Sequence, residues 1–194
     1  MAYLERMELT NALNSGTHHF LHVLDKVGAD DLSRPTPCEG WSVADLLTHV
    51  ARGSDMAVAL VLGATTEEAS AFFQQEAPAD PVDACRESLD AQLVALHDEN
   101  DRDKIVHHPM GDIPVSQLMN FRIGDLTLHA WDLARAIGAD EELPVPLVEQ
   151  VYRVLQPLET VIGQIGVFGE GPSGEVGADA STQVKLLDLT GRRP

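Results

Sequence analysis

The chain has 194 residues, of which 44% are apolar, so it can bury one substantial core and is expected to form a single domain over residues 1–194. Its 13 basic and 31 acidic residues give a formal net charge of −18, so the average surface repels phosphate backbones and anionic lipids, and neither nucleic acid nor a membrane is an expected partner. The chain has only two cysteines, which are too few for a disulfide framework. It has no basic segment followed by an apolar run at its start and no apolar stretch near ~20 residues, so it is predicted to be cytoplasmic.

The first half of the sequence predicts three long helices. Apolar residues at helical spacing indicate a first helix from about Glu5 to Val27. Ser42 and Asp45 are spaced as in a capping box, with Asp in place of the usual Glu, so a second helix is expected from Val43 to about Leu62. A third is expected from Val82 to about Asn100, after a proline-containing boundary.

The most apolar predicted helix lies in the middle of the chain. Residues Ile105 to Ile113 could form a short extended excursion, and a fourth helix is expected from Val115 to Ile137, with Gly138 as its C-cap. This helix carries apolar side chains on nearly every side, which predicts that it is buried. Its ionisable residues therefore need an explanation, because a buried charge is costly without a partner.

The last quarter of the sequence is less regular. A fifth helix is expected from Pro146 to about Ile162, interrupted or kinked near Pro157. The glycine-rich stretch from Gly163 to Ala180 is expected to be a loop, and a short C-terminal element follows from Thr182 to Leu189. These elements predict an all-α protein.

Three ionisable residues lie on or beside the apolar faces of these helices. His49 shares an apolar stripe of the second helix, and Asp125 and His129 are one turn apart on the fourth, so both can reach one point. Antiparallel packing of the two helices would bring all three side chains together, as in other bundles that hold metals in their cores. Two imidazoles and a carboxylate can hold a divalent metal and leave coordination positions open. A buried structural cluster is the alternative that the spacing leaves open.

The other histidines are weaker candidates for metal ligands. His18 and His22 also have i,i+4 spacing, but they project away from the apolar face and are expected to be solvated. His107 and His108 are adjacent in the chain and cannot easily chelate one ion together, and His97 has no partner in the sequence.

Four strings of residues, in order along the chain, resemble a known family. They are Thr-Pro-Cys-Glu-Gly-Trp at 36–41, Leu-Leu-Thr-His-Val at 46–50, the segment 125–134 with its Asp-x-x-x-His-Ala-Trp-Asp-Leu-Ala pattern, and Leu-Thr-Gly-Arg at 189–192. The combination resembles the metal-binding domain of mycothiol-dependent maleylpyruvate isomerases, in the DinB/YfiT-like superfamily. The resemblance implies a DinB-like four-helix bundle, here with an additional C-terminal helix.

The resemblance also implies a divalent ion, often zinc, bound by His49, Asp125 and His129. Those isomerases carry Glu at the carboxylate position, whereas Asp125 is one methylene shorter, so the helix would sit closer to the ion or a water would bridge. They also have an additional C-terminal domain, for which this chain has no room, so the resemblance does not predict maleylpyruvate isomerisation itself.

The leading hypothesis is a metal-dependent transferase or isomerase in which the ion activates a small-molecule thiol for attack on an electrophile. By the resemblance, that thiol is mycothiol. The alternatives are a non-catalytic ligand-binding or sensor bundle and a metal-dependent hydrolase. The sequence identifies neither the ion, among zinc, nickel, iron and manganese, nor the electrophile, and it leaves a homodimer open.

Arg122 has two possible roles because it lies one turn before Asp125 on the same side of the helix. It can pair with that carboxylate or bind an anionic group of the substrate, and the pairing is slightly favoured.

Three further residues receive structural roles from the sequence. Trp41 is expected to anchor the core, and Cys38 to pack within the turn before the second helix. Asp132 is expected to bond to a backbone amide or to Arg135, with no catalytic role.

Overall fold

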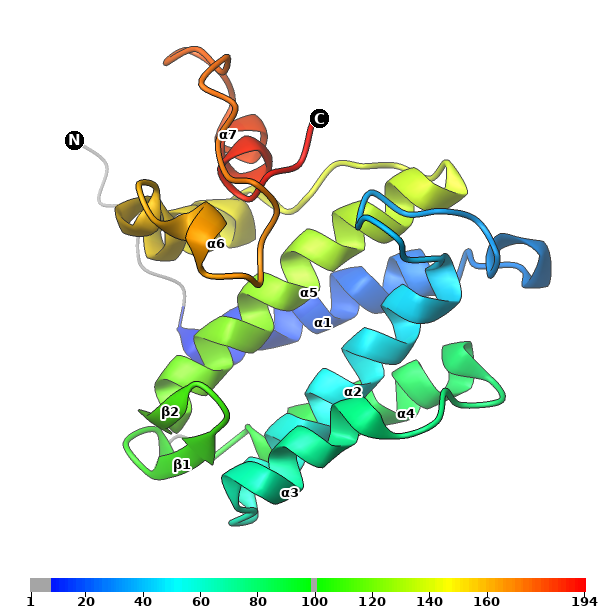
Figure 1. The fold of residues 1–194 in the computed structure, drawn as a ribbon, viewed down its shortest axis with the longest axis vertical. Coiled ribbons are helices and arrows are strands. Elements are labelled where there is room, and N and C mark those ends of the chain that lie inside the picture. Colours follow the sequence, from blue (N-terminus) through cyan, green and yellow to red (C-terminus); the bar gives the residue numbers. More distant parts are fainter. Residues whose placement is uncertain (1–7, 99–100) are drawn as a thin grey trace.

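The computed structural model describes residues 8–98 and 101–194, and its main body is a bundle of four long helices (Figure 1). Helix α2 lies against α4 and α5, and α1 lies against α5 and α4, so the four helices close around one core. This arrangement confirms the predicted all-α, DinB-like four-helix bundle. The four helices are α1 (Leu9–Leu24), α2 (Val43–Val61), α4 (Pro81–Ala95) and α5 (Val115–Ile137).

The helices that carry the candidate site begin and end where the local sequence predicts. Ser42 Oγ accepts a hydrogen bond from the Asp45 amide at 3.2 Å, and Asp45 Oδ2 accepts one from the Ser42 amide at 2.9 Å, which completes the capping box of α2. Helix α5 spans the predicted residues and ends at Gly138, whose φ of 72° lies in the left-handed region that glycine adopts without strain.

Two predicted helix boundaries fall on residues that the structure does not describe. The predicted start of the first helix at Glu5 and the predicted end of the third at Asn100 both lie outside the described residues. Helix α4 starts at Pro81, one residue before the prediction, with Asp80 accepting from the amides of Val82 and Asp83.

A short helix that the sequence analysis did not predict follows α2. Helix α3 (Thr66–Ala71) continues into the 3-10 turn η2 (Phe72–Gln74). Thr65 and Glu68 form a second capping box, with the Glu68 carboxylate 2.8 Å from the Thr65 amide, and this starts the helix immediately after the break at Gly63. The segment packs against α2, close to the candidate site.

The predicted extended excursion is a β-hairpin. Strands β1 (Ile105–His108) and β2 (Gly111–Pro114) pair antiparallel, with Val106 opposite Ile113. Gly111, at a φ of 120°, permits the tight turn between them. Pro114 then forms the N-cap of α5, so the hairpin leads directly into the central helix.

The C-terminal quarter forms a helical pair beside the bundle. Helix α6 (Val145–Leu155) packs on α5, and α7 (Thr182–Leu189) packs on α6 (Figure 1). Helix α6 is shorter than predicted because Pro157 lies in the 3-10 turn η4 (Gln156–Leu158); a second such turn is η5 (Ile162–Gln164), and η1 (Ala29–Asp31) precedes α2. Helix α7 is the predicted additional C-terminal helix.

Large apolar side chains from α1, α2 and α5 fill the bundle. Trp131 and Phe20 are the largest of the fully buried side chains, at 1% and 0% exposure. Within the described residues, no helix combines the length and the apolar character needed to cross a bilayer.

Candidate metal centre

The three predicted ligands meet where α2 faces α5. His49 comes from α2, and Asp125 and His129 come from successive turns of α5. His49 Nε2 lies 3.3 Å from Asp125 Oδ1, and His129 Nε2 lies 3.4 Å from the same oxygen. The two imidazoles and the carboxylate therefore point at one another, as the i,i+4 spacing and the packing of the two helices predict.

The geometry of this cluster fits a divalent ion. Two donor atoms that each lie about 2.1 Å from one ion are about 3.0–3.4 Å apart at ordinary coordination angles. The two measured nitrogen–oxygen distances of 3.3 and 3.4 Å fall in that range, and the three donor atoms all lie within 4.8 Å of one another. The His49 and Asp125 side chains are 27% and 21% exposed, so one side of the cluster remains open to solvent and to further ligands.

Arg122 is buried and bonds to protein groups on several sides. Its side chain is 6% exposed, and Nη1 donates to Asp125 Oδ2 at 2.9 Å. Nε donates to Gln92 Oε1 at 2.7 Å, and Nη2 donates to Ser54 Oγ at 3.2 Å. These contacts match the pairing with Asp125 that the sequence favoured, and they leave Asp125 Oδ1 to face the two histidines.

The charges around Asp125 and His129 shift both pKa values. Burial alone would raise the pKa of Asp125, but the positive charges of Arg122, His129 and His49 outweigh it and hold the pKa well below its usual value. Burial alone would lower the pKa of His129, but the neighbouring carboxylates of Asp125 and Asp132 raise it well above its usual value. The surroundings therefore favour the anionic form of Asp125 and the cationic form of His129.

Asp132 fixes the other side of the His129 ring. Its carboxylate is fully buried, and Oδ2 lies 2.9 Å from His129 Nδ1. Burial alone would raise the pKa of Asp132, but the bonds to His129 and Arg192 bring it down to about 2, so the ionised carboxylate accepts a hydrogen bond from the Nδ1–H of His129. Nε2 of His129 is thereby directed toward Asp125.

Arg192 holds Asp132 through two parallel hydrogen bonds. Nε donates to Oδ1 at 2.9 Å and Nη2 donates to Oδ2 at 2.6 Å. The sequence prediction that Asp132 bonds to an amide or to Arg135 was therefore wrong: Arg135 bonds to Glu141 instead. The i,i+3 spacing of Asp132 from His129 could have indicated their contact, but no local pattern indicates that Arg192, 60 residues away in the chain, is the partner.

Cys38 reaches the same buried carboxylate. Its Sγ donates to Asp132 Oδ2 at 3.3 Å and lies 3.8 Å from His129 Nδ1. Cys38, His129 and Asp132 are thus a second group with metal-donor atoms close together. Arg192 engages both oxygens of Asp132, whereas Arg122 engages only Oδ2 of Asp125, so the group of His49, Asp125 and His129 is the better place for a cation.

Two aromatic rings flank the histidines. The Trp41 ring centroid lies 4.8 Å from that of His49 and 5.9 Å from that of His129, and Trp41 is a partly buried residue that packs against the core, as predicted. Phe73, which is 41% exposed, lies 5.7 Å from His49 on a centroid-to-centroid measure. The sequence analysis did not predict the turn η2 and therefore did not identify Phe73. Gln75, the residue after η2, accepts a hydrogen bond from Arg52 of α2 through its backbone carbonyl.

The remaining histidines lie outside this cluster. His18, His22 and His97 are exposed, and His107 pairs with Asp112 at 2.8 Å. Among the described residues, the two groups of potential metal donors both include His129.

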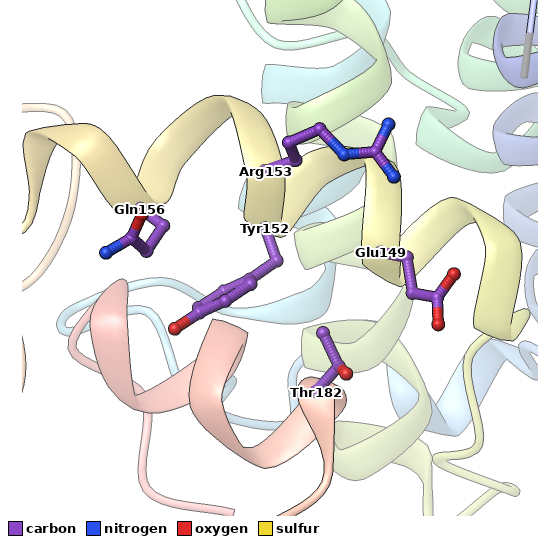
Figure 2. A pocket seen from close by; sticks show the side chains of 5 residues that line it. All are labelled: Glu149, Tyr152, Arg153, Gln156 and Thr182. Atoms are coloured by element: carbon purple, nitrogen blue, oxygen red, sulfur yellow. The ribbon is translucent and has the colours of Figure 1, made fainter. Parts of the chain in front are cut away.

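Two hollows lie beside α6 and α7. One has a volume of about 340 Å³; Figure 2 shows its lining residues, which are Glu149, Tyr152, Arg153, Gln156 and Thr182. The other, of about 570 Å³, has an acidic lining at residues 140–142. Neither hollow is lined by a member of the two donor groups.

The sequence matches one family over most of the bundle. The family is described as the mycothiol maleylpyruvate isomerase N-terminal domain, and the match covers residues 13–134. His49, Asp125, His129 and Asp132 lie inside that range, and Arg192 lies outside it.

Two curated relatives come from Mycobacterium tuberculosis. The uncharacterized proteins Rv0738, from strain H37Rv, and MT0763, from strain CDC 1551, are each 30% identical to this chain over 128 residues. The matched segment covers 64% of this chain and 64% of each relative, so the likeness spans somewhat less than two thirds of their length.

Two solved structures share the fold. The crystal structure of the mycothiol-dependent maleylpyruvate isomerase superposes with a TM-score of 0.63 at 19% sequence identity, over 84% of this chain and 75% of that chain. A histidine-to-alanine mutant of that isomerase gives a TM-score of 0.64 at 18% identity, with the same coverage.

Proposed function

The chain belongs to the mycothiol maleylpyruvate isomerase N-terminal domain family, and on that premise we propose that it is a metal-dependent enzyme that transfers or isomerises through a small-molecule thiol. The observation that carries the proposal is the convergence of two imidazole nitrogens on one carboxylate oxygen at a partly open surface. Mycothiol is the thiol that the family indicates. The second substrate is a small electrophile.

His49, Asp125 and His129 are the residues that would hold the ion, and zinc is the first choice for this donor set. A divalent ion bound there lowers the pKa of a coordinated thiol, so that a thiolate nucleophile is present at neutral pH. Arg122 serves this proposal by holding Asp125 Oδ2 at 2.9 Å, which leaves Oδ1 for the ion. The short Asp125 side chain would then act as a single-oxygen ligand.

The residues around the open side would receive the organic substrates. The Trp41 and Phe73 rings both lie close to the His49 ring and would offer apolar surface to a flat electrophile. Arg122 is not proposed to bind the substrate, because its guanidinium already donates to Asp125, Gln92 and Ser54.

The proposal is tested first by elemental analysis of the untagged protein beside His49→Ala and His129→Ala. About one equivalent of zinc or a similar ion in the wild type, reduced in both variants, is the expected result. Cobalt substitution then tests the thiol: addition of mycothiol should produce a sulfur-to-cobalt charge-transfer band. No metal in the wild type after reconstitution would refute the proposal.

Turnover distinguishes an enzyme from a binding protein. The zinc-loaded wild type should accelerate conjugation or isomerisation of at least one member of an electrophile panel with mycothiol, and His129→Ala should not. Stoichiometric metal and thiol binding without rate enhancement would instead indicate a ligand-binding bundle, and hydrolysis without thiol would indicate a hydrolase.

A further inference from the structure

We propose that Arg192 is a positioning residue of the candidate metal centre: the C-terminal turn holds Asp132, and Asp132 holds the His129 ring in the orientation that the ion requires. The effect on the ion rests on the proposed function. The effect on the ring is a property of the metal-free protein. Arg192 is in the turn after α7, beyond residues 13–134 that match the family model, and is the last residue of the Leu-Thr-Gly-Arg string at 189–192.

The contacts form an unbroken chain from the C-terminal turn to the ligand. Arg192 engages both oxygens of Asp132, at 2.9 and 2.6 Å, and Asp132 Oδ2 lies 2.9 Å from His129 Nδ1. Asp132 is completely buried and the Arg192 side chain is 11% exposed, so water does not compete effectively for these bonds. Two parallel bonds between guanidinium and carboxylate fix the plane of the carboxylate as well as its charge.

The fold places Arg192 at this position through a close contact between two glycines. A Cβ on Gly191 would lie 2.7 Å from the Gly169 Cα, so the loop before α7 and the turn after it touch backbone to backbone. Gly191 has a φ of 79°, and the Arg192 amide donates to the Leu187 carbonyl at 2.8 Å. The turn is therefore folded back on α7 and directs the Arg192 side chain at α5.

A second contact ties the same turn to α5. Arg135, three residues after Asp132, donates from Nη1 to the carbonyl of Arg193 at 2.7 Å. The turn thus contacts α5 at two neighbouring residues, Arg135 and Asp132. Asp132 in turn bonds to the candidate ligand His129.

The orientation of His129 depends on this support. With Nδ1 bonded to Asp132, Nε2 lies 3.4 Å from Asp125 Oδ1, and the His129 ring meets the His49 ring nearly edge-on with centroids 5.1 Å apart. A second carboxylate that binds the far nitrogen of a metal-bound histidine typically improves metal affinity by about 10–100-fold. Without Arg192, the buried Asp132 would lose its main counter-charge and would no longer be held in the plane that suits His129.

The test compares three variants of the full chain at one fixed pH: Arg192→Gln, Arg192→Lys and Arg193→Gln. Arg193→Gln is the matched control, because Arg193 is the neighbouring arginine, is 52% exposed and pairs with Asp188 rather than Asp132. The first readout is the His129 Nδ1–H resonance in ¹H–¹⁵N NMR of the metal-free protein. The second is the Zn²⁺ dissociation constant measured by competition with a chelator.

Wild type and Arg193→Gln should show a slowly exchanging, downfield His129 Nδ1–H resonance, and Arg192→Gln should lose it or broaden it by exchange. Arg192→Gln should also weaken Zn²⁺ binding by about 10-fold or more. Arg192→Lys keeps the charge but cannot form two parallel hydrogen bonds, so its Zn²⁺ affinity should lie between those of the wild type and Arg192→Gln. If Arg192→Gln does not fold, the same two readouts on Arg192→Lys decide.

The proposal is overturned if the folded Arg192 variants keep the Nδ1–H resonance and bind Zn²⁺ within about twofold of the wild type. A loss of thermal stability with both readouts unchanged would also overturn it, because Arg192 would then be only a tie between α7 and α5. If the wild type binds no Zn²⁺, the proposed function fails, and the NMR readout still decides whether Arg192 positions His129.

Discussion

The glycine at position 53 is required by the arginine that holds Asp125, and the substitution Gly53→Ala tests this directly. A Cβ at Gly53 would overlap Nη1 of Arg122 and lie 3.1 Å from its Cζ. The Arg122 guanidinium cannot easily move aside, because it is bonded to Gln92, Asp125 and Ser54 in a buried space. In an unconstrained helix interior, the same substitution would be favourable.

The expected cost follows from these contacts. Overpacking a buried site costs about 1–3 kcal/mol, and losing a hydrogen bond to a charged group costs about 1.5–3 kcal/mol. The better helix propensity of alanine returns about 1 kcal/mol. Gly53→Ala should therefore destabilise the metal-free protein by about 1.5–5 kcal/mol.

Urea denaturation of the metal-free protein measures this cost, and Gly16→Ala is the matched control. Gly16 is also a buried helical glycine, but a Cβ there would meet its nearest neighbours at 3.8 Å, an ordinary contact. Gly16→Ala should be neutral or stabilising by up to about 1 kcal/mol. A Gly53→Ala protein as stable as the wild type would show that Arg122 is not held as the hydrogen bonds indicate.

Three further results are expected. Cys85 is completely buried, and burial raises the pKa of its thiol to about 12, so a thiol reagent at mildly alkaline pH should label Cys38 in the native protein and Cys85 only after unfolding; equal native labelling would contradict this burial. Hydrogen bonds from the Ser42 side chain and amide lower the pKa of Asp45, so its stabilising effect should be complete above the unfolded pKa of about 3.9 and disappear as the pH falls through the lower folded value. The difference in unfolding free energy between wild type and Asp45→Asn, measured by urea titration across acid pH, should therefore shrink as the pH falls. A difference that does not change with pH would refute this prediction. Under the proposed function, zinc at one hundred times its dissociation constant should stabilise the wild type by about 2.7 kcal/mol in thermal or urea unfolding, and His129→Ala should fold but show no such zinc effect.

Local patterns in the sequence were sufficient to predict the helices that carry the candidate ligands. Ser42 and Asp45 define the start of α2 and Gly138 defines the end of α5, because caps and left-handed glycines act within a few residues of themselves. Once both helices were placed, His49 and the i,i+4 pair on α5 could be expected to meet, since each lies on or beside an apolar face that must be buried.

The supporting residues could not be predicted in the same way. Phe73 reaches His49 only because α3 and η2 fold back against α2, and the sequence analysis assigned no helix there. Arg192 reaches Asp132 only because α7 packs on α6 and the Gly191 turn reverses the chain. Such partners depend on tertiary packing, and periodicity within one helix carries no information about them.

Positively and negatively charged side chains alternate in the series of contacts through the cluster, which indicates whether the fold depends on a bound ion. The series runs through Arg122, Asp125, His129, Asp132 and Arg192, and each carboxylate contacts one guanidinium and at least one imidazole. Every member therefore has an oppositely charged or hydrogen-bonding partner before any ion binds. In small structural zinc domains the unfolded chain is stable without metal because nothing else satisfies the ligands or fills the core.

Here, by contrast, the candidate ligands lie on helices packed around a large apolar core, and the two arginines already balance the carboxylates of Asp125 and Asp132. An ion at this site would replace contacts between Asp125 and the two histidines and would leave the bonds to Arg122 and Arg192 in place. The fold and the candidate site are therefore separable. A ligand substitution such as His49→Ala should change what the protein binds far more than whether it folds, because its ring is partly exposed and its removal leaves both arginine–carboxylate pairs intact.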